Sequence, residues 1–162
     1  MRIIPLSCMK HLLLPALLLL ASPAAFAQKG APATDVEAVK KTINTFFDGM
    51  RKGDSALVRS TLAPTAILQT ITNRNGVVQV RTENPKEVLK MMGTPHKEVY
   101  DERISFEQVL VDAQLASAWT PYQFYVGSTF SHCGYNSFQL VKLAEGWKIA
   151  YIIDTRRKEP CK

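Results

Sequence analysis

Residues 119–157 read WTPYQFYVGSTFSHCGYNSFQLVKLAEGWKIAYIIDTRR, and this stretch decides the fold. It contains three runs typical of β-strands, separated by short turns near 127–129 and 144–146. Within these runs aromatic, histidine, asparagine and aspartate side chains alternate with aliphatic ones. Because neighbouring side chains on a strand point to opposite faces, the pattern predicts a curved sheet with polar groups on an otherwise apolar concave face.

The part of the chain before this stretch predicts three helices. Apolar residues at helical spacing predict a first helix from Thr34 to about Gly53, begun by a capping box of Thr34 and Glu37. A short second helix over 55–62 is capped by Asp54. A third helix begins with Asn84 as its N-cap and Pro85 in its first turn, and ends near Gly93.

Strands are expected between and after these helices. Two short strands, 65–72 and 77–81, flank an Asn75-Gly76 hairpin turn. The runs 100–111 and 115–126 predict a second hairpin, which the strands 131–143 and 147–154 extend. This order of elements predicts an α+β fold, a cone-shaped half-barrel of a strongly curved, mostly antiparallel sheet with about three helices packed on its concave face.

Three motifs carry a resemblance to known proteins. They are W-x-P-Y-x-F from Trp119, S-H-C-G-x-N-S-F-Q-L-V-K from Ser131, and W-K-I-x-Y-I-I-D-T-R-R from Trp147. The chain resembles the nuclear-transport-factor-2-like (SnoaL-like) superfamily, and in it the secreted bacterial group called "putative lumazine-binding". The resemblance covers nearly the whole chain after residue 33. It implies a pocket inside the cone but selects no function, because this superfamily includes isomerases, dehydratases, cyclases and binding or dimerisation modules.

The N-terminus has the pattern of a secretory signal peptide over residues 1–27. A basic start precedes a ten-residue apolar run, Leu12 to Ala21, and Ala25-x-Ala27 is a cleavage pattern. An uncleaved anchor is the alternative, but the run is shorter than the ~18 residues that a span needs. The sequence therefore predicts export to the periplasm or outside, a flexible linker over 28–33, a single domain over 34–162 and no membrane association after cleavage.

The net charge and the cysteines limit the classes of partner, disulfide and cofactor that the sequence predicts. The net charge is +6 for the whole chain, and its densest basic cluster is Arg156-Arg157-Lys158. An anionic partner is one interpretation, but a solvated tail is favoured and no nucleic-acid binding is predicted. An oxidising compartment makes a Cys133–Cys161 disulfide plausible, although the predicted hairpin places Cys133 opposite position 157 or 158 and the tail would have to fold back. No zinc-site spacing is present and no cofactor is predicted.

Strand alternation selects the residues of the predicted pocket. His132, Asn136 and Phe138 share one face of their strand, and Phe138 marks it as the inward one. Tyr122 and Phe124 share a face of the neighbouring strand, whereas Trp119 has the other parity. A three-residue turn in the last hairpin would place Asp154 opposite Asn136 and inward, and a two-residue turn would place Ile153 there. The predicted ligand-binding residues are Trp119, Tyr122, Phe124, His132, Asn136, Phe138 and Asp154.

Each polar candidate also has a structural interpretation. His132 is the candidate catalytic acid or base, or it is a histidine hydrogen-bonded for structure at the start of a strand. Asp154 could orient His132, but a salt bridge to Arg156 or Arg81 is favoured. Asn136 and Tyr122 could bind a ligand or form a satisfied buried pair.

Three functions remain open on the sequence. The leading one is an exported binding protein for a small hydrophobic or heterocyclic ligand. The second is an isomerase or dehydratase in which His132 moves a proton, although few acids are expected on inward strand positions. The third is a homodimerisation module that uses the outer face of the sheet, with Ser137, Gln139, Val141 and Leu143.

Overall fold

The computed structural model describes residues 33–94, 96–158 and 161. The predicted signal peptide (1–27) and residues 28–32 of the predicted linker lie outside the described residues, and Ala33 already belongs to the first helix. In chain order the elements are α1 (Ala33–Lys52), α2 (Ser55–Thr61), β1 (Leu62–Arg74), β2 (Val77–Glu83), α3 (Pro85–Gly93), β3 (Tyr100–Ile104), β4 (Gln108–Asp112), β5 (Leu115–Val126), β6 (Thr129–Leu143) and β7 (Gly146–Thr155).

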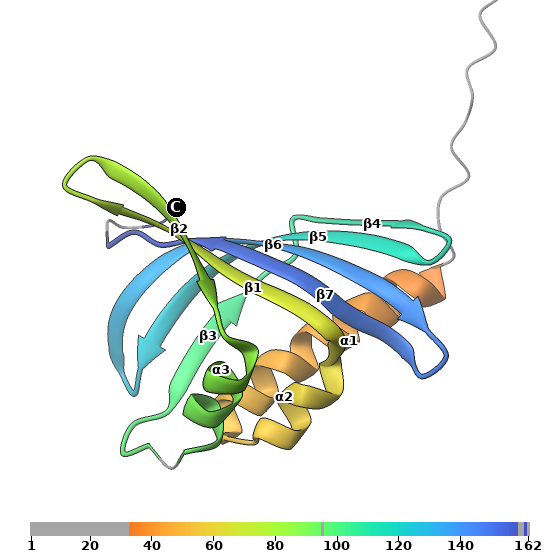
Figure 1. Ribbon diagram of the computed structural model, residues 1–162, viewed down its shortest axis with the longest axis horizontal. Coiled ribbons are helices and arrows are strands. Elements are labelled where there is room, and N and C mark those ends of the chain that lie inside the picture. The colour runs from red at the N-terminus through yellow and green to blue at the C-terminus, as the bar shows by residue number, and fades with distance from the viewer. Residues whose placement is uncertain (1–32, 95, 159–160, 162) are drawn as a thin grey trace, which may run out of the picture.

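The seven strands form one curved sheet. Its order is β2-β1-β7-β6-β5-β3, and β4 also pairs with β5 (Figure 1). The β1–β7 pair is parallel and the other pairs are antiparallel. The last three strands, β5, β6 and β7, therefore lie at the centre of the sheet.

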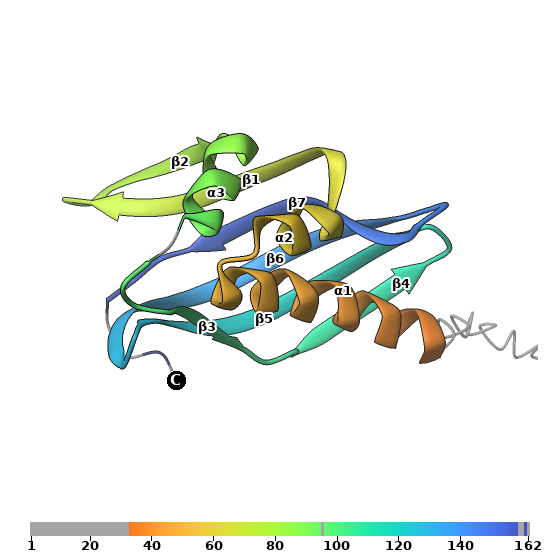
Figure 2. The same cartoon turned by 90° about the horizontal axis from the view of Figure 1, so that it is seen from below.

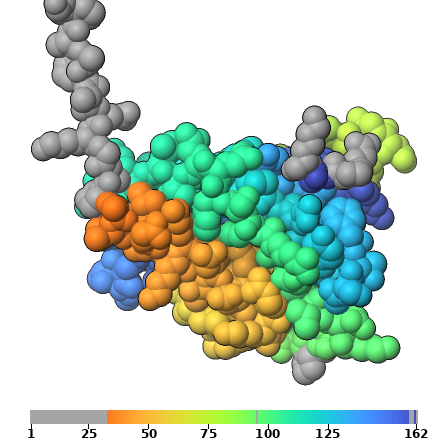
Figure 3. All heavy atoms as spheres, turned by 180° about the vertical axis from the view of Figure 1, so that it is seen from behind, coloured from red at the N-terminus to blue at the C-terminus, as the bar shows by residue number. Residues whose placement is uncertain are grey.

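The helices cover the concave face of this sheet. Figure 2 shows α1 and α2 lying across the strands β5, β6 and β7, with α3 beside β1. Figure 3 shows the same layering from behind, with the helices (orange to yellow) against the strands (green to blue). The core lies between the layers, and its fully buried side chains include Val39, Ile43, Val58, Phe138, Leu140 and Ile149. The predicted α+β half-barrel is confirmed.

Two of the three predicted helix caps are confirmed. Asp54 accepts a hydrogen bond from the backbone N–H of Leu57, and Asn84 accepts one from that of Lys86. The prediction for Thr34 is wrong, because α1 begins at Ala33 and Thr34 lies within it. Asp35 in the same turn instead accepts hydrogen bonds from Lys142 Nζ (2.6 Å) and Trp147 Nε1 (3.1 Å). The start of α1 is thereby fastened to the last hairpin.

The single strand predicted over 100–111 is divided into β3 and β4. Ile104 pairs with Tyr122 and Gln108 pairs with Trp119. Between these two pairs the β3–β4 segment has one residue more than β5, so residues 105–107 bulge out of the ladder. Ser105 still donates to the carbonyl oxygen of Pro121, and Glu107 to that of Trp119. The division lets the sheet bend over the helices while its hydrogen bonds to β5 continue.

None of the helices in the described part of the chain is long and apolar enough to cross a bilayer.

Candidate functional site

A cavity of about 330 Å³ lies between the concave face of the sheet and the helices. Apolar side chains of α1 and α3 form one side of it, among them Phe46, Phe47, Met50, Val88, Met91 and Met92. The strands contribute its polar side, with Glu102, Tyr122, His132, Asn136, Asp154 and Arg156. The cavity is therefore apolar toward the helices and polar toward the sheet.

The register of the last hairpin brings Asp154 into this cavity. The turn is of the two-residue kind, since Leu143 pairs with Gly146, and this alone would place Ile153 opposite Asn136. A β-bulge then intervenes: Leu140 pairs with Ile149 but Gln139 pairs with Tyr151, so Ala150 is the extra residue. The bulge shifts the register by one, and Asn136 faces Asp154.

Asp154 is almost fully buried, and both of its carboxylate oxygens accept hydrogen bonds. Its Oδ1 accepts from Thr70 Oγ1 at 2.6 Å, and its Oδ2 lies 3.0 Å from both Tyr122 Oη and Arg156 Nε. Arg156 also donates to Thr70 Oγ1 at 3.0 Å, which closes the network. The salt bridge from Asp154 to Arg156 is formed, whereas Arg81 pairs with Glu83. In the described part of the chain Asp154 forms no hydrogen bond with His132, and it holds the wall of the cavity together.

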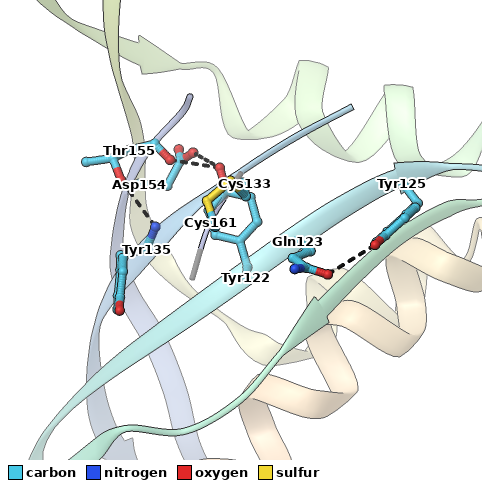
Figure 4. The surroundings of a disulfide bond; sticks show 8 residues. All are labelled: Tyr122, Gln123, Tyr125, Cys133, Tyr135, Asp154, Thr155 and Cys161. Atoms are coloured by element: carbon cyan, nitrogen blue, oxygen red, sulfur yellow. Dashed lines mark hydrogen bonds between the residues drawn. A yellow bond between two sulfur atoms is a disulfide. The ribbon is translucent and has the colours of Figure 1, made fainter. Parts of the chain in front are cut away.

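Tyr122 reaches Asp154 across the intervening strand β6. Its hydroxyl shares one proton between Asp154 Oδ2 and the carbonyl oxygen of Thr155, which is 2.8 Å away (Figure 4). The residue of β6 that pairs with Tyr122 is Gly134, which has no side chain to block this path. Burial and the negative charge of Asp154 raise the pKa of Tyr122, so the hydroxyl keeps its proton.

Glu102 is the site residue that sequence reasoning missed. It lies on β3, and its Oε1 accepts a hydrogen bond of 2.8 Å from Asn136 Nδ2. Burial raises the pKa of this carboxyl to about 7, against the opposing effect of the Asn136 hydrogen bond. A signal was present in the sequence, because Glu102 shares strand parity with Tyr100 and Ile104, which pack against the core. Three acids line the cavity, Glu83, Glu102 and Asp154, where the sequence led us to expect few.

His132 lies at the aromatic end of the cavity. Its ring stacks on Phe124 with centroids 4.8 Å apart, and it meets the ring of Tyr122 edge-on at 5.7 Å. Its Nδ1 lies 3.1 Å from Ser131 Oγ. Burial, together with the positive charge of Arg156, lowers the pKa of His132, so the ring is neutral at neutral pH.

Trp119 does not belong to this site. It is 42% exposed on the outer face of the sheet, where it stacks on Tyr135 with ring centroids 5.3 Å apart. Its strand parity, opposite to that of Tyr122, accounts for this placement. The structure brings the other six predicted ligand-binding residues together around the cavity, and Phe138 at its base packs edge-on against Phe47.

The C-terminal residues are fastened to the outer side of the site. Cys133 forms backbone hydrogen bonds with Arg157, and a disulfide joins it to Cys161, with the two Cα atoms 6.1 Å apart (Figure 4). This pairing holds the end of β7, and with it Arg156, against β6. The basic cluster of the sequence is therefore divided: Arg156 enters the cavity wall and Arg157 lies over the ring of Tyr135.

The described residues contain no group of three or more His, Cys, Asp or Glu side chains arranged to hold a metal ion. The polar side chains of the cavity can form hydrogen bonds and transfer protons.

Comparison with known proteins gives one matching family and several solved structures of similar fold. The family described as "Putative lumazine-binding" matches residues 34–151. An "ntf2-like protein of unknown function" from Shewanella baltica is 14% identical, with a TM-score of 0.61 over 80% of this chain and 98% of that one. A conserved protein from Planctomyces limnophilus is 15% identical, with a TM-score of 0.63 over 78% of this chain and 98% of that one.

A third solved structure, from Streptomyces avermitilis, is described as "a putative dehydratase from the NTF2-like family". It is 16% identical, with a TM-score of 0.57 over 80% of this chain and all of that one. At these identities the likeness shows the fold alone, and it confirms the nuclear-transport-factor-2-like architecture. No curated protein matches the chain.

Proposed function

We propose that this chain, which belongs to the family described as "Putative lumazine-binding", binds a small hydrophobic or heterocyclic molecule in the cavity between its sheet and helices. The observation that carries the proposal is the cavity itself. It holds about 330 Å³, is mostly apolar, and converges on a few fixed polar groups at the sheet. Concave apolar sites with few, well-placed polar groups are typical of small-molecule binding.

The prearranged polar wall also supports binding. Thr70, Tyr122, Asp154 and Arg156 hold one another by hydrogen bonds, so these groups need not be ordered when a ligand enters. Preorganisation of this kind lowers the entropic cost of association. Glu102, Asn136 and His132 then remain as the groups that can contact a ligand.

The test is native mass spectrometry of the protein purified from its own host, followed by denaturation. A bound ligand appears as an additional mass that is lost on unfolding. Asn136→Ala should lower the occupancy, and Ser137→Ala, one residue away on the outer face of β6, should leave it unchanged. Equal occupancy in both variants would argue against binding in this cavity.

The proposal includes export from the cytoplasm. A disulfide between Cys133 and Cys161 is a typical feature of an oxidising compartment and supports this localisation. Cell fractionation with an antibody against the mature domain tests it. Recovery of the protein only from the cytoplasm, in reduced form, would refute export.

A proton-transferring enzyme is the second candidate function. The observation in its favour is the pKa of about 7 at Glu102, because a general base works best when its pKa is near the working pH. Isomerase and dehydratase substrates with a carbonyl group are the class to screen. Glu102→Gln and His132→Ala should each abolish turnover, whereas a binding protein shows no turnover in any variant.

The proposal also includes a homodimer formed through the outer face of the sheet. This face carries the predicted residues Ser137, Gln139, Val141 and Leu143, and it also exposes Leu110, Leu115 and Trp119. Exposed apolar residues gathered on one face are typical of interaction surfaces. Trp119→Glu should convert a dimer to a monomer in analytical ultracentrifugation, and a monomeric wild-type protein at 100 μM or so would refute this part of the proposal.

A further inference from the structure

Glu102 and Asp154 differ in how far their hydrogen-bonding capacity is used, whereas Glu83, the third acid of the cavity, pairs with Arg81. Both oxygens of Asp154 are occupied, by Thr70, Tyr122 and Arg156. Glu102 receives one hydrogen bond, from Asn136 Nδ2 to its Oε1. Among the described residues nothing donates to its second oxygen or to Oδ1 of Asn136. Two acceptor atoms from neighbouring strands are thus left for a ligand.

The charges in the cavity are also unequal. Arg156 forms an ion pair with Asp154 and is engaged with Thr70 as well. No cation of the described residues lies within ion-pair distance of Glu102. An ionised carboxylate that is withdrawn from water without a counter-charge is costly, and burial accordingly raises the pKa of Glu102. One positive charge is therefore missing from the cavity whenever Glu102 is ionised.

From this imbalance we propose that the ligand is a hydrophobic molecule with one protonated amine nitrogen, held by the Glu102 carboxylate and the Asn136 amide oxygen. The inference rests on the proposed binding function and specifies its ligand class. The apolar part of the ligand packs against the aromatic side chains Phe47, Phe124 and Phe138. An N–H donor that carries a charge makes a stronger hydrogen bond to a carboxylate than a neutral donor does.

Other ligand classes fit these groups less well. A carboxylate ligand would face the negative charges of Glu102 and Asp154, and the positive charge of Arg156 is already balanced by its ion pair with Asp154. A neutral carbonyl ligand would need Glu102 in its protonated form as a donor. A carboxylate ligand should therefore not bind above neutral pH. A neutral carbonyl ligand should bind more weakly as the pH rises.

The pH dependence of amine binding has the opposite sign. The strands and the residue after β7 supply the other polar groups of the cavity: Gln69, Thr70, Glu83, Tyr122, His132, Asn136, Asp154 and Arg156. Glu83 pairs with Arg81, and α1 and α3 contribute apolar side chains. Tyr122 has a raised pKa and His132 a lowered one, so Glu102 is the group that titrates near pH 7. Affinity for an amine should rise about tenfold between pH 6 and pH 8, as the carboxyl ionises.

Three probes with one skeleton test the inference: 1-naphthylmethylamine, 1-naphthylmethanol and 1-naphthoic acid. Isothermal titration at pH 6 and pH 8 measures their affinities for the wild-type protein. We expect the amine to bind at least tenfold more tightly than the alcohol at pH 8, with the acid weakest. Glu102→Gln should abolish both the preference and its pH dependence, whereas Glu107→Gln, on the outer face, should change neither.

The possible results distinguish a wrong ligand class from a wrong binding function. If the alcohol or the acid binds as tightly as the amine, or if amine affinity falls between pH 6 and pH 8, the amine inference is wrong and the binding function stands. If none of the three binds and no molecule is retained in native mass spectrometry, the binding function fails and the inference with it. The wild-type pH profile decides the matter even if Glu102→Gln does not fold.

Discussion

Tyr122 and Asp154 lie on β5 and β7, the two neighbours of β6, and their side chains meet over Gly134 with 3.0 Å between Oη and Oδ2. One hydrogen bond thus joins β5 to β7 over the intervening strand β6, and it runs across the concave face and not along the sheet ladder. This bond fixes the polar wall of the cavity independently of any ligand.

Removal of the Tyr122 hydroxyl tests this relationship. Tyr122→Phe should lower the free energy of unfolding by about 1–3 kcal/mol, because the buried Asp154 carboxylate loses a donor. Urea unfolding followed by circular dichroism measures the change. Tyr125→Phe is the matched control on the same strand, since its exposed hydroxyl contacts only Gln123 (Figure 4), and it should stay within about 0.5 kcal/mol of wild type. Equal losses in the two variants would contradict the prediction.

Gly134 is required by close packing. A Cβ atom at this position would overlap the backbone carbonyl oxygen of Thr155, which cannot rotate away as a side chain does. Gly134→Ala should therefore destabilise the protein by about 1–3 kcal/mol, as overpacking generally does. Thermal unfolding of this variant beside Ser137→Ala measures the effect. A Gly134→Ala protein as stable as wild type would show that β6 and β7 can move apart at this point.

Two buried threonines should respond to the same substitution with opposite signs. Thr120 is fully buried and its Oγ1 has no hydrogen-bond partner among the described residues. Thr70 is equally buried, but its Oγ1 bonds both Asp154 and Arg156. Thr120→Val should leave stability unchanged or raise it by about 1 kcal/mol, and Thr70→Val should lower it by about 1–3 kcal/mol. Chemical denaturation of both variants at pH 7 checks the difference in sign.

Stability should also depend on pH through Glu102. Burial raises its pKa from 4.5 to about 7 in the folded protein, so folding favours the protonated form. The contribution of Glu102 is fully present below pH 4 or so and is lost as the pH rises through about 7. Glu102→Gln, which stays neutral, should gain about 1–3 kcal/mol relative to wild type between pH 5 and pH 8. Denaturation of both proteins at the two pH values measures this gain; Glu107→Gln should show none.

Much of the fold follows from local sequence signals. The caps at Asp54 and Asn84, the Asn75-Gly76 turn and the alternation from His132 to Leu140 each act within a few residues, so the sequence alone was enough to predict them. The cavity face of β6 follows from the same alternation. The start of α1 was misjudged because helix ends depend on contacts such as those of Asp35 with the last hairpin, which local patterns do not contain.

The site was harder to predict because its key contacts join distant segments. Glu102 meets Asn136 across 34 positions of sequence, and Thr70 meets Asp154 across 84. Strand parity selects which side chains share a face, but it does not say which strands lie beside one another. Trp119 was wrongly included among the site residues because it is aromatic, although its strand parity already placed it on the outer face of the sheet.

The bulge at Ala150 gives the cavity a dependence on chain length. Trp147 and Ile149 point inward before the bulge, and Ile152 and Asp154 point inward after it. The one additional residue, Ala150, therefore decides whether the Asp154 carboxylate lies in the cavity or in solvent. A deletion of Ala150 would exchange the two faces of the strand end without altering any other side chain. In an alignment of relatives, the number of residues from the Gly146 turn to the aspartate should therefore separate proteins with this polar wall from proteins without it, even where the aspartate itself is present in both.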